Sequence, residues 1–187
     1  INVFKQHNEN MKSLIGIEYS YGSYKNYKTT IKRLKNYITK KYNANDISLT
    51  QIDYNFIYNF SQFLLLHTEC NHNGMMKHIQ RFKKITNFCI KNNYITKDPF
   101  FGFKISFKKS NRVYVTNNEL HTLQNITLNS SLSKVRDIFL FACYTGLSYI
   151  DLYNLSLKNI TKGIDNLQWI YVKRQKTNIP SNIPILP

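Results

Sequence analysis

The residues best suited to chemistry gather in the last third of the chain. An apolar run there ends at Thr145-Gly146-Leu147-Ser148, and Asp151 follows three residues after Ser148. Further on, Arg174 and Lys176 stand two residues apart in a segment of strand-like composition. On an extended strand alternate side chains leave the same face, so this guanidinium and this ammonium are expected to point the same way. Such a pair can grip a phosphate and donate a proton to an oxygen that leaves it.

The charge of the chain agrees with a phosphate-rich partner. Its 187 residues include 26 Lys and Arg against 10 Asp and Glu, a formal net charge of +16. Of these, 17 basic and six acidic residues precede Lys109, so the front of the chain is the more electropositive part. A protein this basic usually meets a polyanion, and nucleic acid is the commonest one. An anionic membrane surface is the competing interpretation.

Composition also argues against several classes of protein. The sequence has no run near the roughly 18 apolar residues of a membrane span and no leader peptide, so we expect a cytoplasmic protein. Three sparse cysteines, Cys70, Cys89 and Cys143, are expected to be free thiols rather than disulfides or zinc ligands. The acids are scattered, whereas metal-dependent nucleases need converging carboxylates, so no metal is expected.

Two amphipathic segments dominate the first hundred residues. Apolar residues recur at helical spacing in each, which predicts two helices of an all-helical bundle. The residues expected on their buried sides are Tyr24, Tyr27, Ile31, Leu34, Ile38, Met75, Ile79, Phe82, Thr86 and Cys89. Neither segment contains an acid, so their outer faces carry unbalanced positive charge. The candidate contacts to a nucleic-acid backbone on these faces are Lys25, Lys32, Arg33, Lys77, Arg81 and Lys84. The alternative is an ordinary set of solvated surface cations.

Other helix and strand signals complete the chain. A further helix is expected over residues 1–20, and a capping box at Thr116 and Glu119 opens another one. A helix from about residue 133 is expected to end at Gly146. Strands are expected at Trp169–Val172 and Ile183–Leu186, with a turn between them.

This part of the chain resembles the front of a tyrosine recombinase (phage-integrase family) catalytic domain. The resemblance rests on three features in this order: the block that contains Ser148 and Asp151, then Trp169, then Lys176-Thr177. The likeness is greatest to the integrases of Bacteroides-type mobile elements. It implies a mainly α fold: a helical, SAM-like core-binding domain (1–100), a linker (101–113) and the truncated front half of a mixed α/β catalytic domain with a small antiparallel sheet (114–187). The two domains are expected to clamp duplex DNA.

The resemblance also implies a reaction. In this family a tyrosine attacks a DNA phosphodiester and forms a 3′-phosphotyrosyl link, without a metal or a high-energy cofactor. Lys176 matches the hairpin lysine that protonates the leaving 5′ oxygen, and Asp151 matches an acidic position that supports the site by hydrogen bonding. The implied function is integration or excision of a mobile element, performed in a bacterial cytoplasm by a homotetramer of the full-length protein on paired sites.

One position departs from the family pattern. Ser148 stands where the family usually has an arginine, and a hydroxyl cannot provide a charged, bidentate grip on a phosphate. Either the enzyme is impaired, or a nearby arginine takes over the role. Arg174 is the candidate substitute, because it precedes Lys176 by two residues. The alternative for Arg174 is a simple contact to a backbone phosphate.

Some expected parts are missing from these 187 residues. The run from His78 to Arg81 spells the family's His-x-x-Arg, but it comes too early in the chain, so His78 is interpreted as packing. Fourteen tyrosines are present, and none follows Lys176, where the nucleophile belongs. This chain is therefore expected to be a fragment that binds DNA without cleaving it. Two alternatives stay open: a non-catalytic, architectural DNA-binding protein and an RNA-binding protein.

Overall fold

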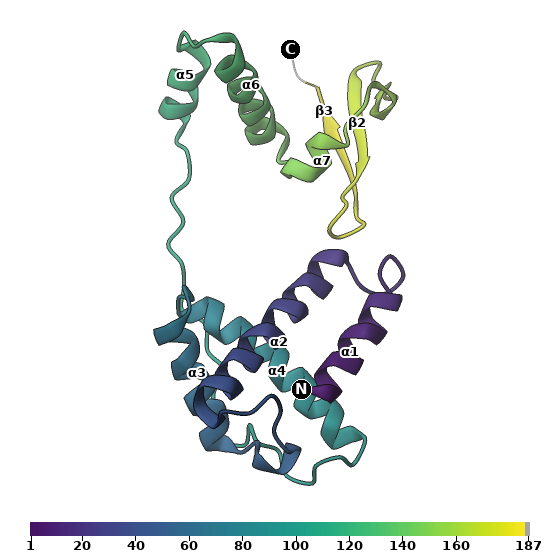
Figure 1. Cartoon of the computed structure of the whole chain (residues 1–187). Coiled ribbons are helices and arrows are strands. Elements are labelled where there is room, and N and C mark those ends of the chain that lie inside the picture. Colours follow the sequence, from purple (N-terminus) through teal and green to yellow (C-terminus); the bar gives the residue numbers. More distant parts are fainter. Residues whose placement is uncertain (186–187) are drawn as a thin grey trace. The chain divides into compact units, whose positions relative to one another are not determined.

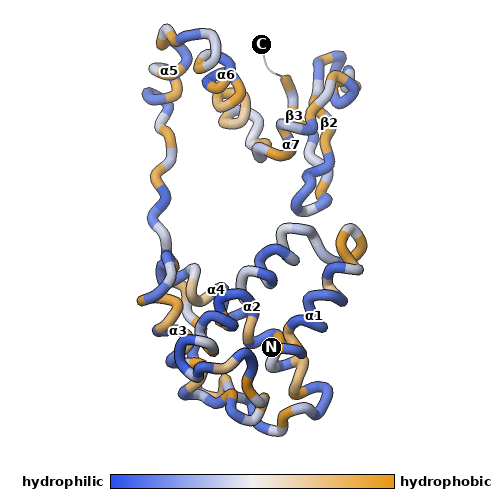
Figure 2. The backbone as a smooth tube through the Cα atoms, viewed as in Figure 1, coloured by the Kyte–Doolittle hydropathy of each residue, from blue (hydrophilic) through white to orange (hydrophobic). Residues whose placement is uncertain are grey.

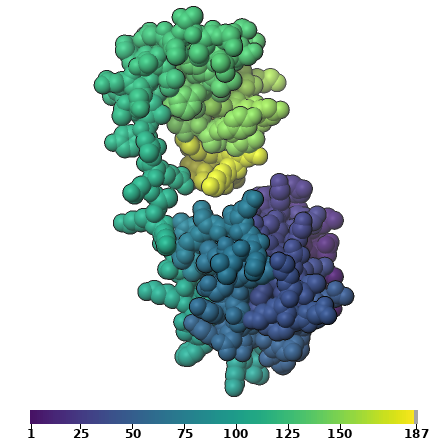
Figure 3. Space-filling view, turned by 60° about the vertical axis from the view of Figure 1, so that its left-hand side comes forward, coloured from purple at the N-terminus to yellow at the C-terminus, as the bar shows by residue number. Residues whose placement is uncertain are grey.

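The computed structural model describes residues 1–185, and its contacts divide the chain into two compact units, Ile1–Asn111 and Arg112–Pro187. Residues 103–116 form neither helix nor strand, and the chain passes from the first unit to the second within this segment (Figures 1 and 3). Phe103 and Ile105, which the sequence assigns to the linker, pack against the core of the first unit. The first of the two units therefore continues past residue 100.

The first unit packs the helices α1 (Asn2–Ser13), α2 (Tyr21–Tyr42), α3 (Tyr54–His67) and α4 (His72–Lys91), together with a short 3-10 helix, η1 (Leu49–Gln51) (Figure 1). The expectation of one helix over residues 1–20 is wrong beyond Ser13. The chain turns at Gly16, whose φ of 88° suits a residue without a Cβ, and α2 starts anew behind Ser20. The Ser20 hydroxyl accepts a hydrogen bond from the amide of Ser23, which caps α2.

The apolar stripes predicted for α2 and α4 form the core of this unit. Nine of the ten predicted side chains are buried, and Tyr24 is half-buried. At the centre of the core, the Tyr37 ring contacts Phe56, Phe60 and Phe63 at centroid distances of 5.2, 5.3 and 5.3 Å. Because these faces point inward, the Lys and Arg residues of α2 and α4 lie at the surface of the bundle, where each is exposed or half-buried.

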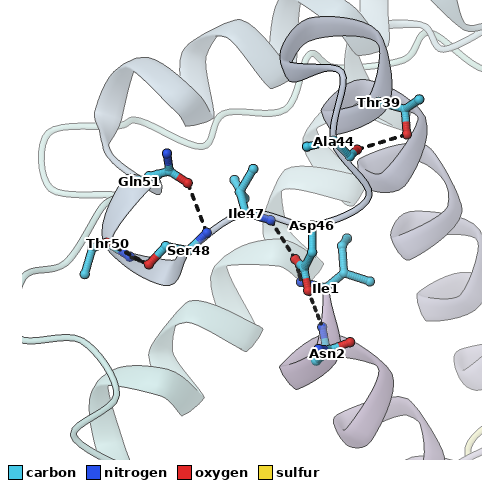
Figure 4. A network of polar contacts seen from close by, with 9 residues as sticks. All are labelled: Ile1, Asn2, Thr39, Ala44, Asp46, Ile47, Ser48, Thr50 and Gln51. Carbon is cyan, nitrogen blue, oxygen red and sulfur yellow. Dashed lines mark hydrogen bonds and ion pairs between the residues drawn. The ribbon is translucent and has the colours of Figure 1, made fainter.

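The connection from α2 to α3 closes the bundle. The Asp46 carboxylate accepts hydrogen bonds from the amino nitrogen of Ile1 (2.6 Å) and from the amide of Ile47 (2.8 Å) (Figure 4). Next to it, Ser48 and Gln51 form a capping box around η1. These contacts attach the start of α1 to the segment that follows α2.

The second unit contains α5 (Asn117–Asn125), α6 (Ser130–Thr145), α7 (Tyr149–Tyr153), the 3-10 helix η2 (Leu157–Asn159), β1 (Ile160–Lys162), β2 (Gln168–Lys173) and β3 (Pro180–Pro184). The predicted capping box of Thr116 and Glu119 is confirmed, as is the left-handed Gly146 (φ 63°) at the end of α6. The strands pair antiparallel in the order β1-β2-β3, with Ile170 opposite Ile183. The sequence did not predict β1, and Leu186, expected in the last strand, lies outside the described residues.

The helix α6 carries much uncovered apolar surface. Leu140 is its buried residue, whereas other large apolar side chains around the helix are at least 38 % exposed. They are Leu132, Val135, Ile138, Phe139, Phe141 and Tyr144. Figure 2 shows hydrophobic residues along much of this helix. A helix that is apolar on most sides is normally enclosed by other structure.

Candidate functional site

The two candidate catalytic cations lie in the turn that joins β2 to β3. Because β2 ends at Lys173 and residues 175–177 form a turn, Arg174 and Lys176 do not belong to a strand. The expectation that Arg174 and Lys176 lie on an extended strand is therefore wrong. The amide of Arg174 donates to the carbonyl of Ile179 (2.9 Å), which closes the turn, and the exposed Lys176 lies within it.

Asp151 fixes this turn to the preceding helix. Its Oδ1 accepts a hydrogen bond from the backbone amide of Gln175 (2.9 Å), and the side-chain amide of Asn154 donates to Oε1 of Gln175 (3.1 Å). Asp151 and Asn154 lie in α7 or at its end, whereas Gln175 lies between Arg174 and Lys176. The residue at the centre of the cationic turn is thus held by two contacts to α7.

Ser148 completes this arrangement. Its hydroxyl donates to Oδ2 of Asp151 (2.6 Å), so both carboxylate oxygens of Asp151 are engaged. The hydrogen bond from Ser148, with those from the Gln175 amide and the charge of Arg174, holds the pKa of Asp151 below its usual value. Asp151 is therefore a buried, ionised acceptor at neutral pH, and Ser148 orients it. The structure brings Ser148 and Asp151 into contact, and it attaches the turn that follows Arg174 to Asp151 through the Gln175 amide.

The basic residues of the first unit carry their charge without acidic partners. Lys25, Lys32, Lys77 and Lys84 are exposed, and Arg33 and Arg81 are half-buried. Within residues 1–185, the ion pairs involve Asp46 and Asp137, and none involves these six residues. Uncharged rings contact two of them instead. The Lys77 ammonium lies 4.8 Å from the centroid of Phe107, and that of Lys84 lies 5.6 Å from the centroid of Tyr19.

A buried polar cluster joins α2 to α4, and the sequence interpretation missed it. Thr30 and His78 are both buried, and their side chains are hydrogen-bonded to each other (2.8 Å). The Arg33 guanidinium contacts His78 at 2.9 Å and also contacts the thiol of Cys70. His78 is thus a hydrogen-bonded core residue and not simply a packing residue. A histidine among the buried positions of an apolar helix face was the available signal.

No metal-binding cluster is found among the described side chains: none of them form a group of three or more His, Cys, Asp and Glu that could hold an ion. Between Ile1 and Ile185, no helix has the length and apolar character needed to cross a bilayer.

The helical unit identifies the family. Residues 1–110 match the phage integrase SAM-like domain, and the chain belongs to this family. No curated protein matches the chain by sequence.

Solved structures share the fold of nearly the whole chain. A lambda integrase (75–356) dimer bound to a COC′ core site superposes with a TM-score of 0.73 at 17 % identity, over 98 % of this chain and 61 % of that chain. A lambda integrase tetramer bound to a Holliday junction gives a TM-score of 0.76 at 17 % identity, over 98 % and 48 %. The Tn1549 transposon integrase in complex with a circular intermediate DNA gives 0.72 at 12 % identity, over 99 % and 60 %.

The predicted relationship to tyrosine recombinases is confirmed, and so is the predicted fold class of a SAM-like helical domain followed by a small antiparallel sheet. This chain spans about half to three fifths of the length of these solved chains.

Proposed function

We propose that this chain is the DNA-gripping and front catalytic part of a site-specific recombinase that integrates or excises a mobile element. The observation that carries the proposal is the fold, which follows lambda integrase over 98 % of this chain. In that structure, lambda integrase is bound to a DNA core site. In the proposal, residues 1–100 form the core-binding domain, 101–113 the linker, whose first residues pack against that domain, and 114–187 the front of the catalytic domain. Since the substrate is DNA, the enzyme acts in the bacterial cytoplasm, as a homotetramer on paired sites.

The proposed chemistry is a transesterification at phosphorus. A tyrosine of the whole enzyme attacks the phosphorus as its phenolate, the bond from phosphorus to the 5′ oxygen breaks, and the Lys176 ammonium donates a proton to that oxygen. The phosphotyrosyl bond keeps the energy of the broken bond, so rejoining needs no external energy source. Arg174 provides the positive charge that Ser148 cannot provide, and Asp151 holds the turn that carries both cations.

This chain by itself binds DNA without cutting it. No tyrosine follows Lys176 in its sequence. The exposed apolar residues of α6 support the view that further protein encloses this helix in the active enzyme, as does the greater length of the related solved chains. The rest of the catalytic domain provides both the cover and the nucleophile.

The competing function is DNA binding without catalysis, which Ser148 favours because it replaces a charged residue with a neutral one. A cleavage assay with the whole enzyme distinguishes the two functions. Nicking of a duplex that carries the recombination site, with a covalent protein–DNA product, supports the recombinase. A whole protein that binds this duplex and never forms the product is an architectural protein.

DNA binding is tested on this chain with a labelled duplex of mixed sequence at increasing salt. We expect the logarithm of the binding constant to fall linearly with the logarithm of the salt concentration. A variant with Lys25, Lys32, Lys77 and Lys84 all changed to Gln should lower that slope, by about 0.9 for each phosphate that the protein no longer neutralises. The matched control changes four other exposed lysines of the same unit to Gln: Lys5, Lys12, Lys97 and Lys104.

Three results would contradict this assignment. Binding that stays constant from low to moderate salt would show that phosphate contacts do not drive it. An equal loss in the control variant would show that only net charge matters. Unlabelled duplex RNA that displaces the DNA more strongly than duplex DNA does would favour the RNA-binding alternative.

A further inference from the structure

We propose that His78 is a positioning residue that holds the guanidinium of Arg33 ready for a DNA phosphate without neutralising its charge. This inference rests on the proposed DNA binding and deepens it, since it separates an oriented phosphate contact from the exposed lysines of the same unit. The interaction joins α2 to α4 within the first unit.

The hydrogen bonds form a chain with one consistent direction. A guanidinium has only donors, so Nη1 of Arg33 donates to Nε2 of His78 (2.9 Å). The proton of the neutral imidazole must then lie on Nδ1, which donates to the hydroxyl oxygen of Thr30 (2.8 Å). That hydroxyl donates to the backbone carbonyl of Asn26 (2.9 Å). Each imidazole nitrogen has one partner, and the ring is held in one orientation.

The surroundings keep this imidazole neutral. Burial, followed by the positive charges of Arg33 and Arg81, lowers the pKa of His78 to about 4. The thiol of Cys70, in the connection that precedes α4, also contacts Arg33. The groups around Arg33 are thus an imidazole and a thiol, and no carboxylate among residues 1–185 pairs with it.

A neutral partner has a specific consequence for a phosphate-binding arginine. A carboxylate in the place of His78 would orient the guanidinium as well, but it would cancel the charge that attracts a phosphate. His78 orients it and leaves that charge intact. Arg33 is half-buried, and in the described part of the chain its Nε and Nη2 make no hydrogen bond. These two donors form the edge of the fork that binds two phosphate oxygens, and ordering the side chain beforehand reduces the entropy lost on binding.

The test is a double-mutant cycle for duplex DNA binding with this whole chain. Arg33→Ala is expected to weaken binding about 10-fold and to lower the salt slope by about 1, as expected when one phosphate is no longer neutralised. His78→Leu leaves Arg33 in place but removes its acceptor, and we expect about a 3- to 10-fold loss. If His78 acts through Arg33, His78→Leu has no further effect in the Arg33→Ala background.

Conservative variants separate positioning from folding. His78→Gln keeps an acceptor for Arg33, so we expect this variant to bind DNA with near wild-type affinity. His78→Leu has no acceptor, so its affinity should stay reduced. Thr30→Val removes the partner of Nδ1 and should weaken binding only while Arg33 is present. If His78→Leu fails to fold by circular dichroism, the same cycle is measured with Thr30→Val.

The outcomes distinguish this inference from the proposed function. A wild-type chain that does not bind duplex DNA would overturn both of them. Suppose that the wild type binds DNA, that Arg33→Ala weakens this binding, and that the His78 or Thr30 variant lowers the affinity equally with and without Arg33. The proposed DNA binding then stands, and the positioning role of His78 is wrong. Equal affinity of His78→Leu and the wild type would overturn it as well.

Discussion

The backbone amide of Gln175 donates a 2.9 Å hydrogen bond to the buried carboxylate of Asp151, across 24 positions of sequence. This bond attaches the β2–β3 turn to α7. Because Lys176 is the next residue, the contact determines where the candidate proton donor can lie. The carboxylate at the position that matches the family's acidic residue thus contacts the backbone of the hairpin turn.

Replacement of Asp151 by Leu should release the turn. The Gln175 amide and the Ser148 hydroxyl lose their acceptor, and the loss of these two partly buried hydrogen bonds lowers the free energy of unfolding by about 1–3 kcal/mol. Hydrogen exchange at the Gln175 amide, measured by NMR, should accelerate. The matched control is Asp137→Asn, which removes an exposed ion pair with Arg136 and costs about 0–1 kcal/mol. Unchanged exchange at Gln175 would show that the bond does not order the turn.

Arg174 is predicted to perform the role of the family arginine whose position Ser148 occupies. In the full-length enzyme, Arg174→Ala should slow strand cleavage on the order of 100-fold, as the loss of one charge-stabilising donor at a reacting phosphate does. Arg174→Lys should retain part of the rate, since it keeps the charge and loses the fork. Lys173→Ala, at the exposed neighbouring residue, is the control. Cleavage by Arg174→Ala at the wild-type rate would exclude the substitution.

The low pKa of His78 predicts a loss of stability in acid. In the unfolded chain the imidazole takes up a proton below its ordinary pKa of 6.5, whereas in the folded chain it does so only near 4. The unfolded state therefore binds more protons between these values, and the free energy of unfolding should fall by on the order of 2 kcal/mol as the pH drops from 6.5 to 4.

Urea unfolding across this pH range measures the effect. His78→Gln should remove most of the decline, whereas His67→Gln, at an exposed position, should leave it in place. Burial also lowers the pKa of His7, so a smaller decline should persist in His78→Gln. An identical pH profile for His78→Gln and the wild type would contradict the neutral, buried imidazole.

Gly163 is predicted to tolerate no side chain. A Cβ at this position would lie 2.7 Å from Cδ1 of Trp169 and 2.8 Å from a carboxylate oxygen of Asp165. Gly163→Ala should therefore destabilise the second unit by about 1–3 kcal/mol. The single tryptophan of the sequence reports this in a fluorescence-detected unfolding curve. Gly22→Ala, in the first turn of α2 with its nearest atom 3.8 Å away, should not destabilise. Equal midpoints for Gly163→Ala and the wild type would contradict the predicted clash.

Local patterns predicted much of the fold. The period of the apolar residues identified the buried sides of α2 and α4, and the capping box at Thr116 marked the start of α5. Both signals are local, because one turn of helix or one cap depends on residues three or four positions apart. The strand β1 was missed because its three residues have no period to detect.

The sequence by itself determined the family, the helical front, the positive charge of α2 and α4, and the residues that could act on a phosphate. Only the tertiary structure decided how those residues are held. Arg33 and His78 lie 45 positions apart, and Asp151 and Gln175 lie 24 apart. No periodicity connects such pairs, since they meet only when separate helices and a turn pack against one another. Strand spacing likewise failed for Arg174 and Lys176, because the hydrogen bonds that the turn donates to Asp151 and Ile179, and not a β-ladder, define their backbone.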